Sequence, residues 1–486
     1  MNARAVMVLG TTSGAGKSWL CTALCRWYAR RGFKVAPFKA QNMSNNARVV
    51  AGTGDVMGEM GSAQYFQALA ARALPDVRMN PVLLKPEHDT ATQVVVLGQV
   101  RADFAQVPWC ERSELLWPFA REALRSLLHE NEVVVIEGAG SPAEINLHAS
   151  DYVNMRTARE AHAACLLVTD IDRGGAFAHL FGTHQLLPLH ERALIRGFVL
   201  NKFRGDAALL TSGLEELEGM TGVPTLAVLP MWRGHGLPEE DGLFDESVSG
   251  TAGTRIAIVA YPRMSNLDEF QSLRQCRGID VRWARTPAVL AGAEWIVLPG
   301  SKHTSGDLAW LREQGLDAPL IRHAAAGGRV LGLCGGLQML GGDMVDPDGV
   351  DGSARGLGLL ALHTRFEPTK MVRRTEARFS HLTHEWKALS GVSFDGYEIR
   401  HGRTTVGPDV VETSVALRNE HGEAIGWQRG NVLALYCHGL FESSDVMRAL
   451  FGVAPRTLDA SFEGMADFID VHFESGALSR LIRRSC

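Results

Sequence analysis

A cysteine surrounded by glycines is the position of this sequence best suited to covalent chemistry. Cys334 lies in the pattern Gly332-Leu333-Cys334-Gly335-Gly336, between an apolar run and a helix-like segment. A strand that turns sharply into a helix at a nucleophile needs glycine on both sides, because the backbone is strained and larger side chains would clash. The start of the helix would also stabilise a thiolate. A buried structural cysteine is the alternative, but the flanking glycines favour a catalytic nucleophile.

A nucleophilic cysteine needs a base, which can lie far away in the sequence. His438, in the segment VLALYCHGLFE, ends another apolar run and precedes Gly439. We therefore predict His438 as the base. A structural histidine at a strand end is the alternative.

A second chemical signal is the glycine-rich segment GTTSGAGKS, which follows the first apolar run and precedes a helical pattern. Backbone amides of such a loop bind phosphates, its lysine reaches the outer phosphates, and its serine hydroxyl binds Mg²⁺. The segment departs from the common pattern, because its first glycine comes one position early and a threonine follows it. The predicted nucleotide-binding residues in this segment are Gly10, Thr11, Gly14, Gly16, Lys17 and Ser18.

Polar residues also follow other predicted strands of the first half. Glu137 ends the run VVVIE, where a carboxylate would complete a magnesium site with Ser18, and Asp55 is a further candidate ligand. Ligands of open α/β sheets bind at the carboxyl ends of strands. Four more residues are therefore candidates for substrate contacts: Glu59, Asp170, Arg173 and Lys202. For the acidic residues, solvated turn positions are the alternative.

Length and composition limit the classes of protein to which the chain can belong. Its 486 residues are enough for two or three domains, and the net charge of −5 argues against a nucleic-acid-binding protein. Eight scattered cysteines fit reduced thiols. Because the N-terminus runs directly into a strand and no apolar stretch approaches transmembrane length, we expect a cytoplasmic protein without membrane association. The sequence does not determine the oligomeric state.

Strand-like and helix-like segments alternate along the chain, which predicts an α/β protein with parallel sheets covered by helices on both faces. In the first half, we expect strands at residues 5–9, 34–37, 94–97, 133–136, 164–169, 196–200 and 225–228. A stretch rich in Gly, Asp, Glu and Ser then indicates a linker, and a new alternation begins at Arg255. We predict a domain with the phosphate-binding loop at 1–232, a linker at 233–253, a domain with the cysteine turn at 254–446 and a helical segment at 447–486.

The chain resembles the cobyric acid synthase family, the glutamine-dependent amidotransferases of cobalamin biosynthesis. The segments that carry the resemblance occur in the family's order, and these are GTTSGAGKS, PFKAQNMSNN, MNPVLLKP, VVIEGAGSPAEINL, DIDRGGAFA, GFVLNKFRGD, LPGSKHT, GLCGGLQMLG, GYEIRHGRT and YCHGLFE. The first half is also similar to the P-loop fold of dethiobiotin synthetase. The resemblance implies a dethiobiotin-synthetase-like parallel-sheet domain followed by a class I glutamine amidotransferase domain.

The activity implied by the resemblance is amidation of the b, d, e and g carboxylates of adenosylcobyrinic acid a,c-diamide. Glutamine would be the nitrogen donor, and ATP and Mg²⁺ would be required. The resemblance further implies that Asn201 contacts the base of the nucleotide. The backbone amides of Gly335 and of a residue near Gly300 would bind the oxyanion formed when Cys334 attacks glutamine.

The sequence departs from relatives that carry a full catalytic triad. Those relatives have the pattern H-x-E, but Leu440 stands two residues after His438. We therefore expect a Cys–His dyad, with Glu442 as the alternative orienting acid. Two other functions stay open at this point: the sister enzyme that amidates the a and c carboxylates, and a nucleotide-binding protein that senses glutamine without hydrolysing it.

Overall fold

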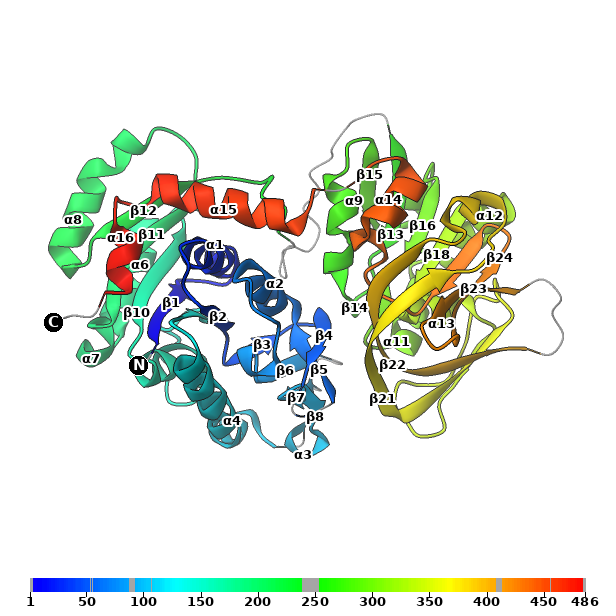
Figure 1. Cartoon of the computed structure of the whole chain (residues 1–486), viewed down its shortest axis with the longest axis horizontal. Helices are drawn as coiled ribbons and strands as arrows, with labels where there is room; N and C mark the ends of the chain where they lie inside the picture. The colour runs from blue at the N-terminus through cyan, green and yellow to red at the C-terminus, as the bar shows by residue number, and fades with distance from the viewer. Residues whose placement is uncertain are drawn as a thin grey trace.

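The computed structural model describes residues 3–52, 54, 56–86, 92–105, 107–237, 253–407, 413–454 and 456–483. Two lobes lie side by side, and each is built around its own β-sheet (Figure 1). Most of the predicted linker, residues 238–252, lies outside the described part, as does the candidate metal ligand Asp55.

The first lobe contains a six-stranded sheet in the order β12-β11-β10-β1-β9-β2. Every neighbouring pair in this sheet is parallel, as the sequence predicted. Its strands are β1 (Arg4–Gly10), β2 (Val35–Phe38), β9 (Val133–Glu137), β10 (Ala164–Asp170), β11 (Ile195–Phe203) and β12 (Thr225–Pro230). Because all six run the same way, their carboxyl ends bring the predicted site residues to one edge.

Alternating residues of these strands bury two separate faces, as the two-residue period of a strand requires. Val6 and Val8 pack in the core with helices α1, α15 (Leu458–His472) and α16 (Ala477–Leu481), whereas Met7 and Leu9 pack in the core with helix α4. The helices of this lobe are α1 (Lys17–Ala29), α2 (Ser62–Ala70), α3 (Ala102–Ala105), α4 (Trp109–Glu130), α5 (Thr157–Glu160), α6 (Ala176–Leu186), α7 (Leu189–Arg192) and α8 (Thr211–Thr221). The parallel sheet is therefore covered on both faces.

Two small sheets are inserted between β2 and α4. One is the hairpin of β4 (Ala47–Ala51) and β5 (Met57–Gly61). The other has the order β3-β6-β7-β8 and comprises β3 (Gln41–Met43), β6 (Val82–Pro86), β7 (Thr92–Val96) and β8 (Gln99–Val100). The predicted strand at 94–97 is thus real, but it belongs to this small sheet, where it pairs antiparallel to both neighbours. A short turn between β7 and β8 permits only an antiparallel pair, so the expectation of parallel pairing was wrong here.

The second lobe contains an eleven-stranded sheet whose path is β15-β13-β16-β18-β25-β24-β23-β21-β19-β20, with β22 paired to β21. One part is parallel and the other antiparallel, so the expected parallel pairing describes only one part of this lobe's sheet. The antiparallel strands are joined without crossover helices. The strands are β13 (Thr254–Val259), β15 (Ile279–Ala284), β16 (Trp295–Leu298), β18 (Arg329–Leu333), β19 (Asp343–Val345), β20 (Ala354–Arg355), β21 (Leu362–Phe379), β22 (Ser393–Val406), β23 (Ser414–Asn419), β24 (Ala424–Arg429) and β25 (Val432–Leu435).

Short helices and a two-stranded pair surround the parallel part of this sheet. The pair is β14 (Met264–Ser265) with β17 (Gly300–Ser301). The helices are α9 (Gln271–Gln275), α10 (Pro287–Leu290), α11 (Thr304–Glu313), α12 (Asp317–Ala325), α13 (Gly335–Leu340) and α14 (Ser444–Phe451), with the 3₁₀ turns η4 (Leu267–Phe270) and η6 (Leu440–Glu442).

The C-terminal segment divides between the two lobes. Helix α14 packs through Val446 and Met447 in the core of the second lobe. Helices α15 (Leu458–His472) and α16 (Ala477–Leu481) return to the first lobe, where α15 lies along α1 (Figure 1). The buried Arg26 of α1 forms ion pairs with Asp459 and Glu463 of α15 at 2.7 and 3.0 Å. The chain therefore crosses between the lobes a second time.

Candidate active sites of the two lobes

The backbone at Cys334 has the strained geometry that the glycine pattern predicted. Cys334 lies between the end of β18 and the start of α13, with φ 50° and ψ −102°. A Cβ atom on Gly336 would lie 2.0 Å from the carbonyl oxygen of Leu298, and one on Gly332 would lie 2.8 Å from the backbone of Gly336. Only glycine fits at these two positions. The glycines of the sequence pattern are therefore required by the turn.

His438 reaches the same edge of the sheet because β25 runs parallel to β18 as its neighbour. Both residues line one cavity. The Nδ1 atom of His438 lies 3.0 Å from Oε1 of Glu269, and the backbone N–H of Gly439 donates to Oε2 of the same carboxylate at 3.3 Å. Burial lowers the pKa of His438, but the Glu269 carboxylate and a hydrogen bond with Cys334 outweigh burial and raise it to about 10. An imidazole in this setting keeps its proton at neutral pH.

Glu269 is the acid in contact with His438 that sequence reasoning missed. It is fully buried and comes from the turn η4, far from His438 in the sequence. The predicted alternative, Glu442, instead forms an ion pair with Arg48. The structure therefore adds an acid to the expected dyad and gives a set of three residues, Cys334, His438 and Glu269. The one sequence signal was an acidic pair between two apolar residues in the segment NLDEF, which occurs shortly after the first strand of this lobe.

The two predicted oxyanion segments lie next to the cysteine turn. A Cβ atom on Gly335 would lie 2.8 Å from the backbone nitrogen of Ser301. One on Gly300 would lie 3.2 Å from Cε1 of His438. The turn at Gly300 is thus packed between the start of α13 and the imidazole, which is where oxyanion donors are needed. The roles of Gly335 and Gly300 stay predictions.

The cavity beside Cys334 has a volume of about 350 Å³ and receives residues from both lobes. The first lobe contributes Asn45, Lys85 and Gln93 to its wall. The second lobe contributes Cys334, His438 and other residues, including Ser265, Asn266, Ser301, Lys302, Thr304, Gln338, Asp351, Lys370, Arg400 and His401. The nucleophile therefore faces a space that the first lobe helps to enclose.

In the first lobe, the glycine-rich loop folds as a phosphate-binding loop at the carboxyl end of β1. Gly14 and Gly16 have φ angles of 72° and 100°. A Cβ atom on Gly16 would lie 2.1 Å from Nδ2 of Asn201, which donates to the carbonyl of Ala15 at 2.9 Å. The loop is therefore packed against the predicted nucleotide-base residue Asn201.

The lysine of the loop folds over the loop itself. Lys17 Nζ donates to the carbonyls of Thr12 and Gly140 at 3.0 and 3.1 Å. A Cβ atom on Gly10 would lie 2.9 Å from Nζ, and the Thr11 hydroxyl donates to Thr169 at 2.9 Å. Glycine at position 10 thus leaves room for the lysine.

The predicted magnesium ligands Ser18 and Glu137 are adjacent. The Ser18 hydroxyl donates to Oε1 of Glu137 at 2.9 Å, and Lys39 and Gln67 contact the same carboxylate at 2.7 and 2.5 Å. Burial raises the pKa of Glu137, but the Lys39 ammonium outweighs burial and lowers it, so the carboxylate is ionised. A hydroxyl beside an ionised carboxylate at a phosphate-binding loop fits Mg²⁺, which takes one or two protein oxygens and completes its shell with phosphate and water.

Three of the four substrate candidates lie near this loop and one does not. Lys202 Nζ lies 2.9 Å from the carbonyl of Gly14 and 3.0 Å from Asp170, and Arg173 lies 3.9 Å from the same Asp170 carboxylate. Glu59 is instead buried between Lys85 of its own lobe and Lys370 of the second lobe, at 2.5 Å from each. Burial raises the pKa of Glu59, but the surrounding lysines lower it below its ordinary range. Glu59 therefore joins the lobes in this structure.

Comparison with known proteins matches each lobe to a known domain family. Residues 255–446 match the CobB/CobQ-like glutamine amidotransferase domain, and residues 6–234 match the CobQ/CobB/MinD/ParA nucleotide binding domain. A protein of Methylibium petroleiphilum named cobyric acid synthase is 72% identical, with 99% of this chain and 97% of that protein covered. Proteins of the same name from Leptothrix cholodnii and Variovorax paradoxus are 65% and 64% identical over 99% of this chain and 97% and 100% of their own lengths.

The chain belongs to the cobyric acid synthase family. It is an amidotransferase of the ligase class, with a nucleotide-binding half and a glutamine amidotransferase half. The family assignment favours the cobyric acid synthase function over two alternatives that the sequence left open, the a,c-diamide synthase and the glutamine sensor. Among the helices in the described ranges, none is long and apolar enough to cross a membrane.

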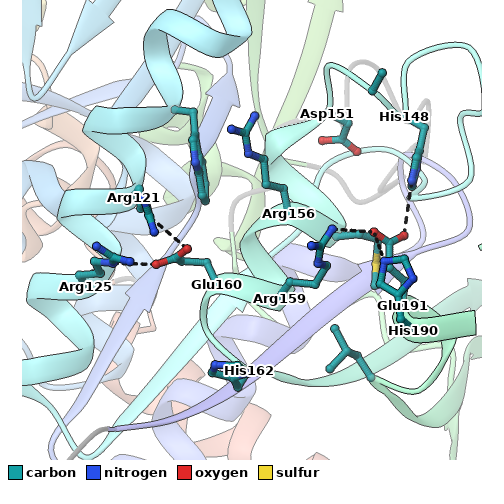
Figure 2. A pocket seen from close by; sticks show the side chains of 14 residues that line it. Arg121, Arg125, His148, Asp151, Arg156, Arg159, Glu160, His162, His190 and Glu191 are labelled. Carbon is teal, nitrogen blue, oxygen red and sulfur yellow. Dashed lines mark hydrogen bonds and ion pairs between the residues drawn. The ribbon is translucent and has the colours of Figure 1, made fainter. Parts of the chain in front are cut away.

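A separate basic cavity of about 970 Å³ lies near the amino ends of β10 and β11, since its wall includes His162 and Leu194. Figure 2 shows its charged side chains. Glu160 accepts from Arg125 at 2.6 Å and lies 3.1 Å from Arg121. The Glu191 carboxylate has longer contacts, at 3.7 Å to the guanidinium of Arg159 and 3.5 Å to the imidazole of His148. None of the predicted site residues lines this cavity.

Proposed function

We propose that this protein amidates the b, d, e and g carboxylates of adenosylcobyrinic acid a,c-diamide, using glutamine as nitrogen donor and ATP as the source of energy. One observation carries the proposal. A single chain of this family contains both the set Cys334, His438 and Glu269 and a complete phosphate-binding loop. A glutaminase alone needs no phosphate-binding loop, and a nucleotide switch needs no activated thiol. The use of ATP and glutamine fits a reaction in the cytoplasm.

In the second lobe, the thiolate of Cys334 attacks the amide carbon of glutamine. The amides of Gly335 and of the turn at Gly300 stabilise the oxyanion. The imidazolium of His438 gives its proton to the departing nitrogen, so that ammonia leaves and a thioester remains on Cys334. Water, deprotonated by His438, then releases glutamate. Glu269 keeps the imidazole oriented and favours its protonated form.

In the first lobe, a substrate carboxylate attacks the γ-phosphate of ATP, and ADP leaves. Ammonia then displaces phosphate from the resulting acyl phosphate and forms the amide. Lys17 and the amides of the loop stabilise the charge that develops on the transferred phosphoryl group. Mg²⁺, held by Ser18 and Glu137, would neutralise charge on the phosphates when bound. Asp170, Arg173 and Lys202 are proposed to contact nucleotide or corrinoid.

The shared wall of the cavity beside Cys334 supports direct use of the ammonia by the first lobe. Asn45, Lys85 and Gln93 come from the lobe that carries the phosphate-binding loop. Ammonia released at Cys334 therefore begins its path in a space that both lobes enclose.

The test is an incubation of the protein with adenosylcobyrinic acid a,c-diamide, ATP, Mg²⁺ and glutamine labelled with ¹⁵N in its side-chain amide. Mass spectrometry of the corrinoid should show replacement of carboxylates by labelled amides, and omission of ATP should prevent it. If the authentic substrate keeps its mass while glutamine and ATP are supplied, the proposed function is refuted.

A further inference from the structure

Arg48 of the first lobe forms a buried ion-pair cluster with the second lobe. It lies on β4, and its side chain is 3% exposed. Its guanidinium donates to both oxygens of Glu442, at 2.9 and 2.5 Å, and to Asp268. Both carboxylates belong to the second lobe, so one cation binds two acidic residues across the contact between the lobes.

The two carboxylates lie on the two segments that hold His438 in place. Asp268 directly precedes Glu269, the residue whose carboxylate lies 3.0 Å from the imidazole. Glu442 ends the turn η6, which begins directly after Gly439, and Gly439 itself donates to Glu269. Arg48 therefore ties together the segment that carries the orienting acid and the segment that carries the base.

A second set of contacts joins the same parts of the molecule. The ring of Tyr397 stacks on His438 with centroids 5.3 Å apart, and its hydroxyl accepts from Asn266 at 2.9 Å. The guanidinium of Arg48 lies 5.2 Å from the centre of the Tyr397 ring. Asn46, two residues before Arg48, accepts from the backbone N–H of Leu267 at 2.9 Å. Arg48 and Asn46 of the first lobe thus contact residues that lie around His438.

On its other side, Arg48 contacts helix α2 of its own lobe. The rings of Tyr65 and Phe66 lie 5.4 and 5.1 Å from the guanidinium. The next residue of the same helix is Gln67, which donates to Glu137 beside the phosphate-binding loop. Arg48 is therefore held by a helix that also contacts the nucleotide site.

We propose that Arg48 is a positioning residue for glutamine hydrolysis, so that the glutaminase centre of the second lobe requires an arginine of the first lobe to hold Glu269 and His438 in register with Cys334. The inference rests on the proposed function of Cys334. Its physical basis is that a bidentate guanidinium fixes two carboxylates in one geometry, which a loop contact without charge does not do. A small displacement of a catalytic base is enough to slow a reaction strongly.

The test compares Arg48→Met with Arg374→Met as a matched control. Arg374 of β21 contacts the same hairpin of the first lobe, by donating to the carbonyl of Val49 at 3.2 Å. For Arg48→Met, we expect kcat for glutamine hydrolysis to fall by about 10- to 100-fold. The KM for glutamine should stay within about twofold, since Arg48 does not line the cavity beside Cys334. Amidation driven by added ammonium salts should be retained, and the Arg374→Met variant should match the unaltered protein.

Two further variants separate positioning from simple destabilisation. Removal of Arg48 alone leaves Asp268 as a buried unpaired charge, which destabilises a fold. The double variant Arg48→Met/Asp268→Asn removes that charge and should still show the low kcat. Arg48→Lys keeps the charge and should recover part of kcat.

The inference is overturned if Arg48→Met hydrolyses glutamine as fast as Arg374→Met does. It is equally overturned if the glutamine-driven and ammonia-driven rates of Arg48→Met fall by the same factor, or if the double variant regains full kcat. Failure of the proposed function has a different signature, because the unaltered protein would then leave the mass of adenosylcobyrinic acid a,c-diamide unchanged, whatever its rate of glutamine hydrolysis.

Discussion

Glu269→Gln tests the reasoning about the glutaminase centre most directly. The substitution preserves the size of the side chain and removes its charge. The carboxylate lies 3.0 Å from Nδ1 of His438, and both side chains are almost fully buried, at 0% and 2% exposure. A hydrogen bond to a charged group in such a place contributes about 1.5–3 kcal/mol. Because 1.4 kcal/mol corresponds to about a factor of ten, glutamine hydrolysis should slow by about 10- to 100-fold.

The same substitution should change the pH dependence of thiol reactivity. Glu269 is the main influence that raises the pKa of His438 to about 10. Without the carboxylate, the pKa of His438 falls, and less imidazolium is present at neutral pH to stabilise the thiolate of Cys334. Reaction of Cys334 with iodoacetamide should therefore slow near pH 7 and recover at higher pH.

The assay measures glutamate release from glutamine between pH 6 and pH 10 in parallel with amidation driven by ammonium salts. Glu269→Asp retains a charge at greater distance and should give an intermediate rate, whereas ammonia-driven amidation should be unchanged in both variants. A glutaminase rate for Glu269→Gln within twofold of the unaltered protein across this pH range would refute the assignment of Glu269 as the orienting acid.

Further substitutions test the separate parts of the two centres. Cys334→Ala should abolish glutamine-driven amidation and preserve ammonia-driven amidation, and equal loss with both donors would contradict a separate glutaminase role. Lys17→Ala should abolish amidation with either donor because the γ-phosphate loses its cation, so retained ammonia-driven synthesis would show that the loop is not the ATP site. Glu137→Gln should raise the Mg²⁺ concentration needed for half-maximal amidation, which a Mg²⁺ titration at saturating ATP measures, and an unaltered titration curve would argue against this ligand. Gly336→Ala should lower glutaminase activity and the midpoint of thermal unfolding because its Cβ atom would lie 2.0 Å from the carbonyl of Leu298, and an unchanged protein would contradict the steric argument.

The sequence predicted those features whose cause is local. The turn at Cys334 can be recognised because its glycines are required by contacts with the adjacent backbone. The phosphate-binding loop and the parallel strands of the first lobe follow from short patterns of the same kind. The strand at 94–97 was found, but its partner was not, since a strand pattern does not state which neighbour it pairs with. The mixed sheet of the second lobe escaped prediction for the same reason.

The acid that completes the glutaminase centre could not be found by spacing. Sequence reasoning looked two residues beyond His438, where relatives with a full triad carry an acid, and found Leu440. Glu269 lies 169 positions before His438 and reaches the imidazole only because the turn after β13 and the end of β25 meet at one edge of the sheet. Nothing in a linear pattern specifies that meeting.

By itself, the sequence determined that a glycine-flanked cysteine turn and a phosphate-binding loop occur in one chain, because each needs particular residues at fixed short distances along the backbone. Only the tertiary structure decided which acid orients His438, that Glu442 instead pairs with Arg48, and that Glu59 joins the lobes rather than lying at the loop. The physical reason is that ion pairs between distant segments depend on how sheets and lobes pack, and many acidic residues of a chain are equally eligible until that packing brings one of them within hydrogen-bond distance.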